Sequence, residues 1–325
     1  MRKSANKWLI AAAILVIFGA ILVAAVMTAY HWDFSRLSTD QLETNTYEIR
    51  EDFKGIELNT KTADVRFAAS DDGLCRVVCN EPENVKHSVS VRDDALTIRA
   101  EDNREWHEHI GNELQSPEIT VYLPRAEYES LDITGSTGDV NIPKDFSFAA
   151  ADISISTGSV ELFSSVSGAV KIRTTTGDIR VGNLSAGALE LSVSTGEIDV
   201  SDVICKGDIK AVVTTGEVEM KNVTCQNLTS SGSTGEIELE NTIAAGNISI
   251  ERSAGDVELE KSDAAEIFIK TDTGHVTGSF LSEKVYITET STGRVIVPKE
   301  ATGGRCEIIT STGDIMIGKP TDTDK

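Results

Sequence analysis

Pairs of carboxylate residues recur in the middle of the chain at a spacing of 19 to 20 residues. The paired residues are Glu197 and Asp199, Glu217 and Glu219, Glu236 and Glu238, and Asp256 and Glu258. Carboxylate oxygens are the ligands that Ca²⁺ prefers, and a dense group of them attracts cationic peptides and raises its own pKa values. These eight residues are therefore a candidate site for Ca²⁺ or for a basic partner, and the simpler interpretation is a solvated face that limits aggregation.

Histidines supply a second candidate for metal binding. His107 and His109 alternate with Glu105 and Glu108, and His87 could add a further ligand. A metal site needs three or four ligands that the fold brings together. The sequence favours a polar loop at 105–111 over a metal site.

The usual motifs of catalysis are absent. The sequence contains no G-x-S-x-G, H-E-x-x-H, P-loop or G-x-G-x-x-G pattern, and aromatic residues make up only 5% of it. A formal net charge of −22 also argues against a nucleic-acid partner, because phosphate is held by Lys and Arg. We therefore predict a protein that is not an enzyme, with no catalytic residues and no cofactor beyond Ca²⁺. A polysaccharide-active β-helix enzyme and a passive spacer remain alternatives.

The acidic pairs flank a repeated S/T-T-G motif, and this repeat must position them. Ten glycines mark its copies: Gly138, Gly158, Gly177, Gly196, Gly216, Gly235, Gly255, Gly274, Gly293 and Gly313. Their spacing of 19 to 20 residues predicts a solenoid, in which each coil buries its apolar face against its neighbours.

Each coil is expected to contain two main strands. Residues two and four positions after the glycine are almost all apolar, as in Ile198 and Val200, and those between them are mostly polar. Residues five and seven positions before the glycine are apolar too, as in Leu189 and Leu191. Alternation with a period of two predicts strands that meet at a Thr-Gly corner, where glycine tolerates positive φ, while a looser turn of about eight residues closes the coil. The fold class is all-β, a parallel β-solenoid of about ten coils over 131–318, which we expect to be right-handed.

Residues 46–130 differ from the repeats and are predicted to form an N-terminal β cap with a degenerate first coil. "TADV" at 62–65 stands where later coils have "TGDV". "HSVSVRDDALTIRAED" predicts a hairpin with an Asp-Asp turn, and "SPEITVYLPR" predicts a further strand. Residues 319–325 form a polar tail beyond an open last coil.

The N-terminus is predicted to anchor the chain in a membrane. Residues 8–30 carry no charge, and about 20 apolar residues span a bilayer as a helix. Arg2, Lys3 and Lys7 lie in 1–7 and predict a cytoplasmic N-terminus, so the linker 31–45 and everything after it should be extracytoplasmic. A cleaved signal peptide is the alternative, but its apolar core is usually shorter.

Five cysteines do not suggest a disulfide framework, because the number is odd and no C-x-x-C occurs. Cys205 and Cys225 lie one coil apart and could stack within reach of a disulfide. The simpler interpretation is two small apolar residues that fill a turn.

The segments "IELNTKTADVRF", "DDALTIRA" and "ITVYLPR", followed by repeated "STG[DE][IV]", resemble the bacterial "putative adhesin" family, a domain of unknown function that includes LiaG- and YvlB-like envelope proteins. The resemblance covers 46–318 and implies a membrane-anchored β-solenoid linked to envelope-stress systems, with no catalytic residues to carry over. We therefore expect a membrane-tethered, adhesin-like interaction module of the cell envelope, whose partner is an envelope protein or a cationic peptide.

Overall fold

The computed structural model describes residues 15–19, 21, 24, 27, 28, 42–82, 85–102, 117–299 and 302–319. Within those residues no helix has the length and apolar character to cross a membrane. Most of the predicted anchor 8–30 and of the linker 31–45, together with 1–7 and 320–325, lies outside the described residues. The anchor therefore stays a prediction.

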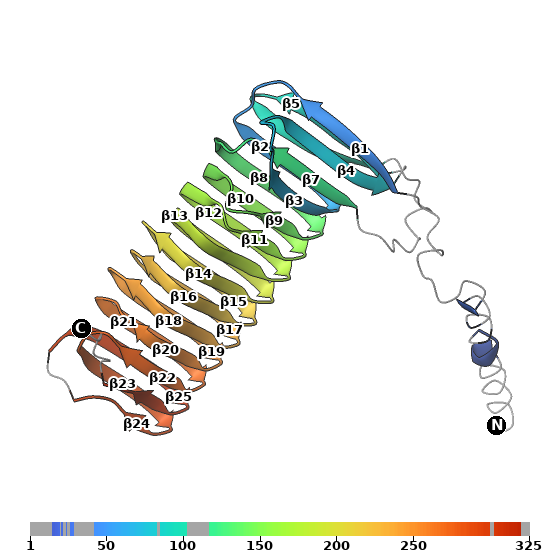
Figure 1. The fold of residues 1–325 in the computed structure, drawn as a ribbon. Coiled ribbons are helices and arrows are strands. Elements are labelled where there is room, and N and C mark those ends of the chain that lie inside the picture. The colour runs from blue at the N-terminus through green and yellow to red at the C-terminus, as the bar shows by residue number, and fades with distance from the viewer. Residues whose placement is uncertain are drawn as a thin grey trace, which may run out of the picture.

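The described strands form one continuous sheet that winds into a solenoid with a cap at its N-terminal end (Figure 1). The cap and first coil comprise β1 (Leu42–Ile49), β2 (Gly55–Thr62), β3 (Asp64–Ala69), β4 (Cys75–Pro82), β5 (Val85–Arg92), β6 (Ala95–Asp102) and β7 (Glu118–Leu123). The coils that follow comprise β8 (Glu127–Thr137), β9 (Val140–Ile142), β10 (Ser147–Thr157), β11 (Val160–Leu162), β12 (Ser165–Thr176), β13 (Ile179–Thr195), β14 (Ile198–Cys205), β15 (Ile209–Thr215), β16 (Val218–Cys225), β17 (Leu228–Thr234), β18 (Ile237–Ala244), β19 (Asn247–Ala254), β20 (Val257–Ser262), β21 (Glu266–Thr273), β22 (Val276–Phe280), β23 (Lys284–Thr292), β24 (Val295–Ile296), β25 (Gly304–Thr312) and β26 (Ile315–Ile317).

The Thr-Gly corner is confirmed. All ten predicted corner glycines have φ between 131° and 158°, a region that side chains with a Cβ rarely enter. They also stack closely, since a Cβ placed on Gly235 would lie 1.8 Å from the carbonyl oxygen of Gly216 in the neighbouring coil. After each corner the inward side chains are buried, as Ile198 and Val200 show. The parallel β-solenoid predicted from the repeat is therefore the observed fold.

The looser turn that we expected on the far side of the coil is wrong. Strands such as β14 and β16 continue through a second corner whose residues have positive φ: Asn183, Asp202, Asn222, Asn241 and Lys261. The Asn241 side-chain amide donates to Asn222 Oδ1, and Asn222 in turn donates to Asp202 Oδ1, both at 2.9 Å. Asn and Asp tolerate this backbone conformation better than most residues, and they occupy four of these five positions.

The last two coils do not stack in the order of the sequence. β25 and β26 pair with β21 and β22 on one side and with β23 and β24 on the other. Accordingly, Thr310 donates to the carbonyl oxygen of Gly274, and Thr290 donates to that of Gly313. The prediction that the last coil in the sequence is the open one is therefore wrong. The coil of β23 and β24 is outermost (Figure 1).

A buried lysine joins the outermost coil to the coil two layers below it. Lys284 begins β23 and stands in register with Gly304 of the inserted coil. Because Gly304 has no side chain, the Lys284 ammonium reaches past it to donate to the carbonyl oxygen of Ala264 at 2.6 Å and to form an ion pair with Asp263. Lys284 is only 2% exposed, so this contact between the two coils is shielded from solvent.

The cap confirms the degenerate first coil. β2 pairs in parallel with β8, and Thr62 stands opposite Thr137, which places Ala63 below Gly138. β5 and β6 form the predicted hairpin, with positive φ at Asp93 and Asp94. The predicted strand in 116–125 is β7, which lies between β3 and β4. The cap thereby covers the first coil of the solenoid.

Candidate functional site

The structure brings the eight predicted carboxylates onto one strip of the solenoid, which we call the acidic face. Its residues are Glu197, Asp199, Glu217, Glu219, Glu236, Glu238, Asp256 and Glu258. In the column formed by β14, β16, β18 and β20, Asp199 is in register with Glu219, Glu219 with Glu238, and Glu238 with Glu258. Neighbouring strands lie about 4.8 Å apart, so the carboxylates of one column are separated by about that distance. The structure therefore places one of the two predicted columns, Asp199, Glu219, Glu238 and Glu258, in direct register.

Residues of both charges border the acidic face. Asp199 is in register with Arg180 of the preceding coil, and burial raises the pKa of Asp199 while Arg180 opposes that shift. On the other side, Glu240 and Glu260 are in register and form a third short column of carboxylates. Lys221 forms an ion pair with Glu240 at 2.5 Å, and this contact raises the pKa of Lys221. Basic residues therefore lie next to the acidic face, and its eight positions are all carboxylates.

Aspartates that directly follow the corner glycine have a structural partner. Asp256 Oδ1 accepts a hydrogen bond from the backbone N–H of His275 at 2.7 Å, and Asp178 Oδ1 accepts one from that of Glu197 at 3.0 Å. Asp139 makes the same bond to Ser159 outside the acidic face. An aspartate at this position thus satisfies an N–H of the next coil, and its carboxylate is less available to a ligand.

Glu217 lies at the electrostatic centre of the face. Burial raises the pKa of Glu217, and the charges of Glu197 and Glu236 raise it further. The charges of Glu219 and Glu238 act in the same direction. Carboxylates that raise each other's pKa are stabilised by an added cation, whether this is a metal ion or a basic side chain. The face can therefore hold cations along its length through carboxylate oxygens.

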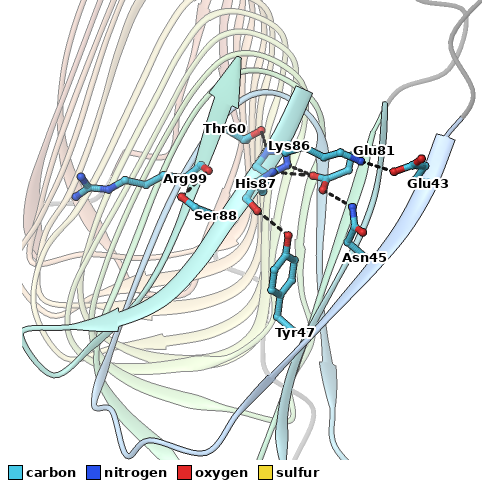
Figure 2. Close-up of polar contacts among 9 residues, drawn as sticks. All are labelled: Glu43, Asn45, Tyr47, Thr60, Glu81, Lys86, His87, Ser88 and Arg99. Atoms are coloured by element: carbon cyan, nitrogen blue, oxygen red, sulfur yellow. Dashed lines mark hydrogen bonds and ion pairs between the residues drawn. The ribbon is translucent and has the colours of Figure 1, made fainter. Parts of the chain in front are cut away.

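A second group of polar residues is buried inside the cap, and we call it the cap cluster: Thr60, Cys79, Glu81 and His87. Figure 2 shows the polar contacts of Thr60, Glu81 and His87. His87 Nδ1 lies 2.7 Å from Glu81 Oε2, and the His87 backbone N–H donates to the same oxygen at 2.9 Å. His87 Nε2 lies 3.1 Å from Thr60 Oγ1, and Asn45 donates to Glu81 Oε1 at 2.9 Å. Burial, with the nearby charge of Glu81, raises the pKa of the Cys79 thiol to about 12.

The order of hydroxyl, imidazole and carboxylate in the cap cluster is that of a hydrolytic triad. Thr60 is 4% exposed, His87 2% and Glu81 0%, so a substrate carbonyl has no access to the Thr60 oxygen. A triad needs its nucleophile within reach of the scissile bond. The cap cluster is therefore not a hydrolytic site as it stands.

Sequence reasoning singled out His87 but missed its partners. A signal was present, because Cys75, Val77, Cys79 and Glu81 alternate along β4 as an inward face, and a glutamate there needs a buried partner. The other residues of the histidine candidate, His107 and His109 with Glu105 and Glu108, lie outside the described residues.

The cysteines form no disulfide bond. All five are free and buried, and Cys205 and Cys225 lie in the column of small residues that also holds Ala186 and Ala244. Burial raises the pKa of Cys225 to about 12. The interpretation of Cys205 and Cys225 as apolar fillers is confirmed.

Comparison with known proteins finds one family and several solved structures. The model of a family described as Toastrack DUF4097 matches residues 53–318. A "putative adhesin" from Parabacteroides distasonis is 14% identical, with 83% of this chain and 98% of that chain covered and a TM-score of 0.47. A second, from Parabacteroides merdae, is 14% identical, with 75% and 98% covered and a TM-score of 0.48.

A "putative lipid binding protein" from Parabacteroides distasonis is 16% identical, with 85% of this chain and 97% of that chain covered and a TM-score of 0.45. A search of the curated proteins finds no match. With TM-scores below 0.5, the solved structures support no inference about what this chain binds.

Proposed function

The chain belongs to the Toastrack DUF4097 family through residues 53–318, and from this premise we propose that it is a non-enzymatic, adhesin-like interaction module whose acidic face binds a cationic partner. The partner is a basic peptide or a basic patch on an envelope protein. The acidic face carries the proposal, because its carboxylates are held in register by the strands rather than by flexible loops. Repeat proteins commonly use such extended surfaces for binding.

The proposed setting is the surface of a bacterial cell. In this proposal residues 8–30 anchor the chain as a single spanning helix, the basic residues before them stay in the cytoplasm, and the solenoid stands in the extracytoplasmic space. The charge-free sequence of that segment and the basic residues of 1–7 support the anchor. A link to the envelope-stress response belongs to the same proposal and follows from the family resemblance.

Charge reversal tests the acidic face. The variant changes Glu217, Glu219, Glu236 and Glu238 to Lys, and the control changes four exposed acids elsewhere, Asp71, Glu127, Asp132 and Asp272, to Lys. Both variants alter the net charge by the same amount. Titration calorimetry of the detergent-solubilised full chain with a Lys/Arg-rich amphipathic peptide measures the affinity at low and at physiological salt.

We expect at least a 10-fold loss of affinity in the acidic-face variant and a much smaller loss in the control, with binding that weakens as salt screens the charges. Equal losses in the two variants would show that net charge alone attracts the peptide, and the proposed site would be wrong. Ca²⁺ is the second candidate ligand of the same face. It is rejected if Ca²⁺ raises the melting temperature no more than Mg²⁺ or NaCl does.

A further inference from the structure

We propose that Cys79, Glu81 and His87 form a Zn²⁺ site inside the cap. The side chains of these residues place one sulfur, one carboxylate oxygen and one imidazole nitrogen within 4.8 Å of one another. All three residues are buried, and they come from two strands, β4 and β5. The inference is independent of the acidic face, which offers oxygen ligands alone.

The spacing of the three donor atoms suits a zinc ion after a small adjustment. Zn²⁺ binds sulfur at about 2.3 Å and nitrogen or oxygen at about 2.0–2.2 Å, so its ligands lie roughly 3.3–3.8 Å apart in a tetrahedron. The donor atoms of the cap cluster span a range from 2.7 Å, between His87 Nδ1 and Glu81 Oε2, to at most 4.8 Å. Shifts of the donor atoms by up to about 1 Å would bring these separations into that range.

Charge balance favours a divalent ion. The total charge is −2 for a Cys79 thiolate, a Glu81 carboxylate and a neutral His87 imidazole. One divalent cation cancels this charge. A buried carboxylate is costly unless it is compensated, and the ion compensates it inside the cap. Thiolate and imidazole ligands select zinc over Ca²⁺ and Mg²⁺, which prefer oxygen alone.

The three proposed ligands are hydrogen-bonded to neighbouring residues, as the ligands of metal sites usually are. A histidine bound to a metal through one ring nitrogen usually donates its other N–H to a neighbour. Here the ion takes Nδ1, the ring proton resides on Nε2, and Thr60 Oγ1 at 3.1 Å accepts it. Asn45 donates to the other oxygen of Glu81 at 2.9 Å, and the Tyr47 hydroxyl donates to the His87 carbonyl at 3.0 Å (Figure 2).

Binding can be written with its protons balanced. The Cys79 thiol releases its proton to solvent as the sulfur joins the ion. The ring proton of His87 leaves Nδ1, where it is shared with Glu81, and a proton is taken up on Nε2, where Thr60 Oγ1 accepts it, so the imidazole stays neutral. Glu81 thereby exchanges its hydrogen bond from Nδ1 for a bond to the metal. A water completes the four ligands, since the cap cluster contributes three in the described part of the chain. The ion then joins β4 to β5.

Metal content and cobalt spectroscopy test the site directly. The full chain is purified without an affinity tag, stripped with a chelator and titrated with Zn²⁺, and bound zinc is measured by mass spectrometry. Co²⁺ replaces Zn²⁺ in a parallel titration, because a cobalt–thiolate bond gives a charge-transfer absorption that oxygen and nitrogen ligands do not. We expect one zinc per chain, a charge-transfer band with cobalt, and a melting temperature that rises with Zn²⁺ and falls with chelator.

Two variants assign the band to the cap. Cys79→Ser should abolish the cobalt–thiolate band and lower zinc affinity at least about 10-fold. Cys75→Ser is the matched control, since Cys75 is a buried thiol on the same face of β4 and lies outside the cap cluster. The proposal is overturned if the wild-type chain binds no zinc, if cobalt binds without a thiolate band, or if Cys79→Ser keeps the band. Should Cys79→Ser fail to fold, the wild-type cobalt spectrum and His87→Gln decide the question.

Discussion

The inverted order of the last two coils can be tested by cross-linking. Glu307 of β25 is in register with Phe268 of β21 on one side and with Ile287 of β23 on the other. Adjacent parallel strands lie about 4.8 Å apart, within the Cα separation that a disulfide spans, whereas Phe268 and Ile287 should lie about 9.6 Å apart, beyond its limit of about 7 Å. All three side chains alternate with inward neighbours, and the five native cysteines are buried.

The assay compares three double-cysteine variants after mild oxidation, by mobility on a denaturing gel and by peptide mass spectrometry. The pairs Phe268→Cys with Glu307→Cys and Ile287→Cys with Glu307→Cys should cross-link nearly completely. The loops that they close have about 40 and 20 residues, so each bond should stabilise the fold by about 3 to 4 kcal/mol. Phe268→Cys with Ile287→Cys should stay reduced. Coils stacked in sequence order would give the opposite result, with the third pair linked and the first reduced, and would refute the inverted order.

Two further predictions concern single buried or crowded charges. Arg252 is 4% exposed and donates Nη1 to the Val213 carbonyl at 2.8 Å, but its Nε and Nη2 have no hydrogen-bond partner among the described residues, and burial lowers its pKa to about 10. Arg252→Met should therefore raise the free energy of unfolding by about 1–3 kcal/mol in a chemical denaturation experiment. A loss of stability would contradict the reasoning from the two unpartnered nitrogens. The pKa of Glu217 is raised in the folded state, so ionisation of this carboxyl group lowers the stability of the fold. This loss of stability is absent below the ordinary pKa, where Glu217 is protonated in both states, and is complete above the raised pKa. Glu217→Gln should accordingly melt at a higher temperature than the wild type near about pH 7 and lose this advantage below about pH 4, as scanning calorimetry at the two pH values would show; an advantage that does not change with pH would contradict the assigned repulsion.

The repeat was predictable because it is a local signal. Period-two alternation indicates which side chains point inward, and the spacing of the motif glycines gives the coil length. The Thr-Gly corner and the acidic columns therefore follow from the sequence alone. The second corner was missed even though its signal was present. Asn183, Asp202, Asn222 and Asn241 recur six residues after the glycine and have the types that tolerate positive φ.

The order of the last two coils could not be derived from the repeat. The repeat pattern predicts that each coil packs against another coil, but it does not specify which coil is the neighbour. Stacking in sequence order was therefore an assumption. The inverted order coincides with single departures from the pattern, namely the buried Lys284 and the glycine at position 304, which leaves room for it. The cap cluster was hidden for a related reason. Alternation places Glu81 on an inward face, but only the packing of β4 against β5 determines that it meets His87.

The inverted coils have a consequence for the synthesis of the chain. The ribosome delivers β23 and β24 before β25 and β26, so the outer coil cannot reach its final neighbour until the last strands have left the ribosome. Until then Lys284 lacks the Gly304 layer that it spans in the finished fold. We expect a chain that stops at residue 303 to be cut by protease within 284–299 much faster than the full chain. Closure of this end would thus follow the synthesis of β25 and β26.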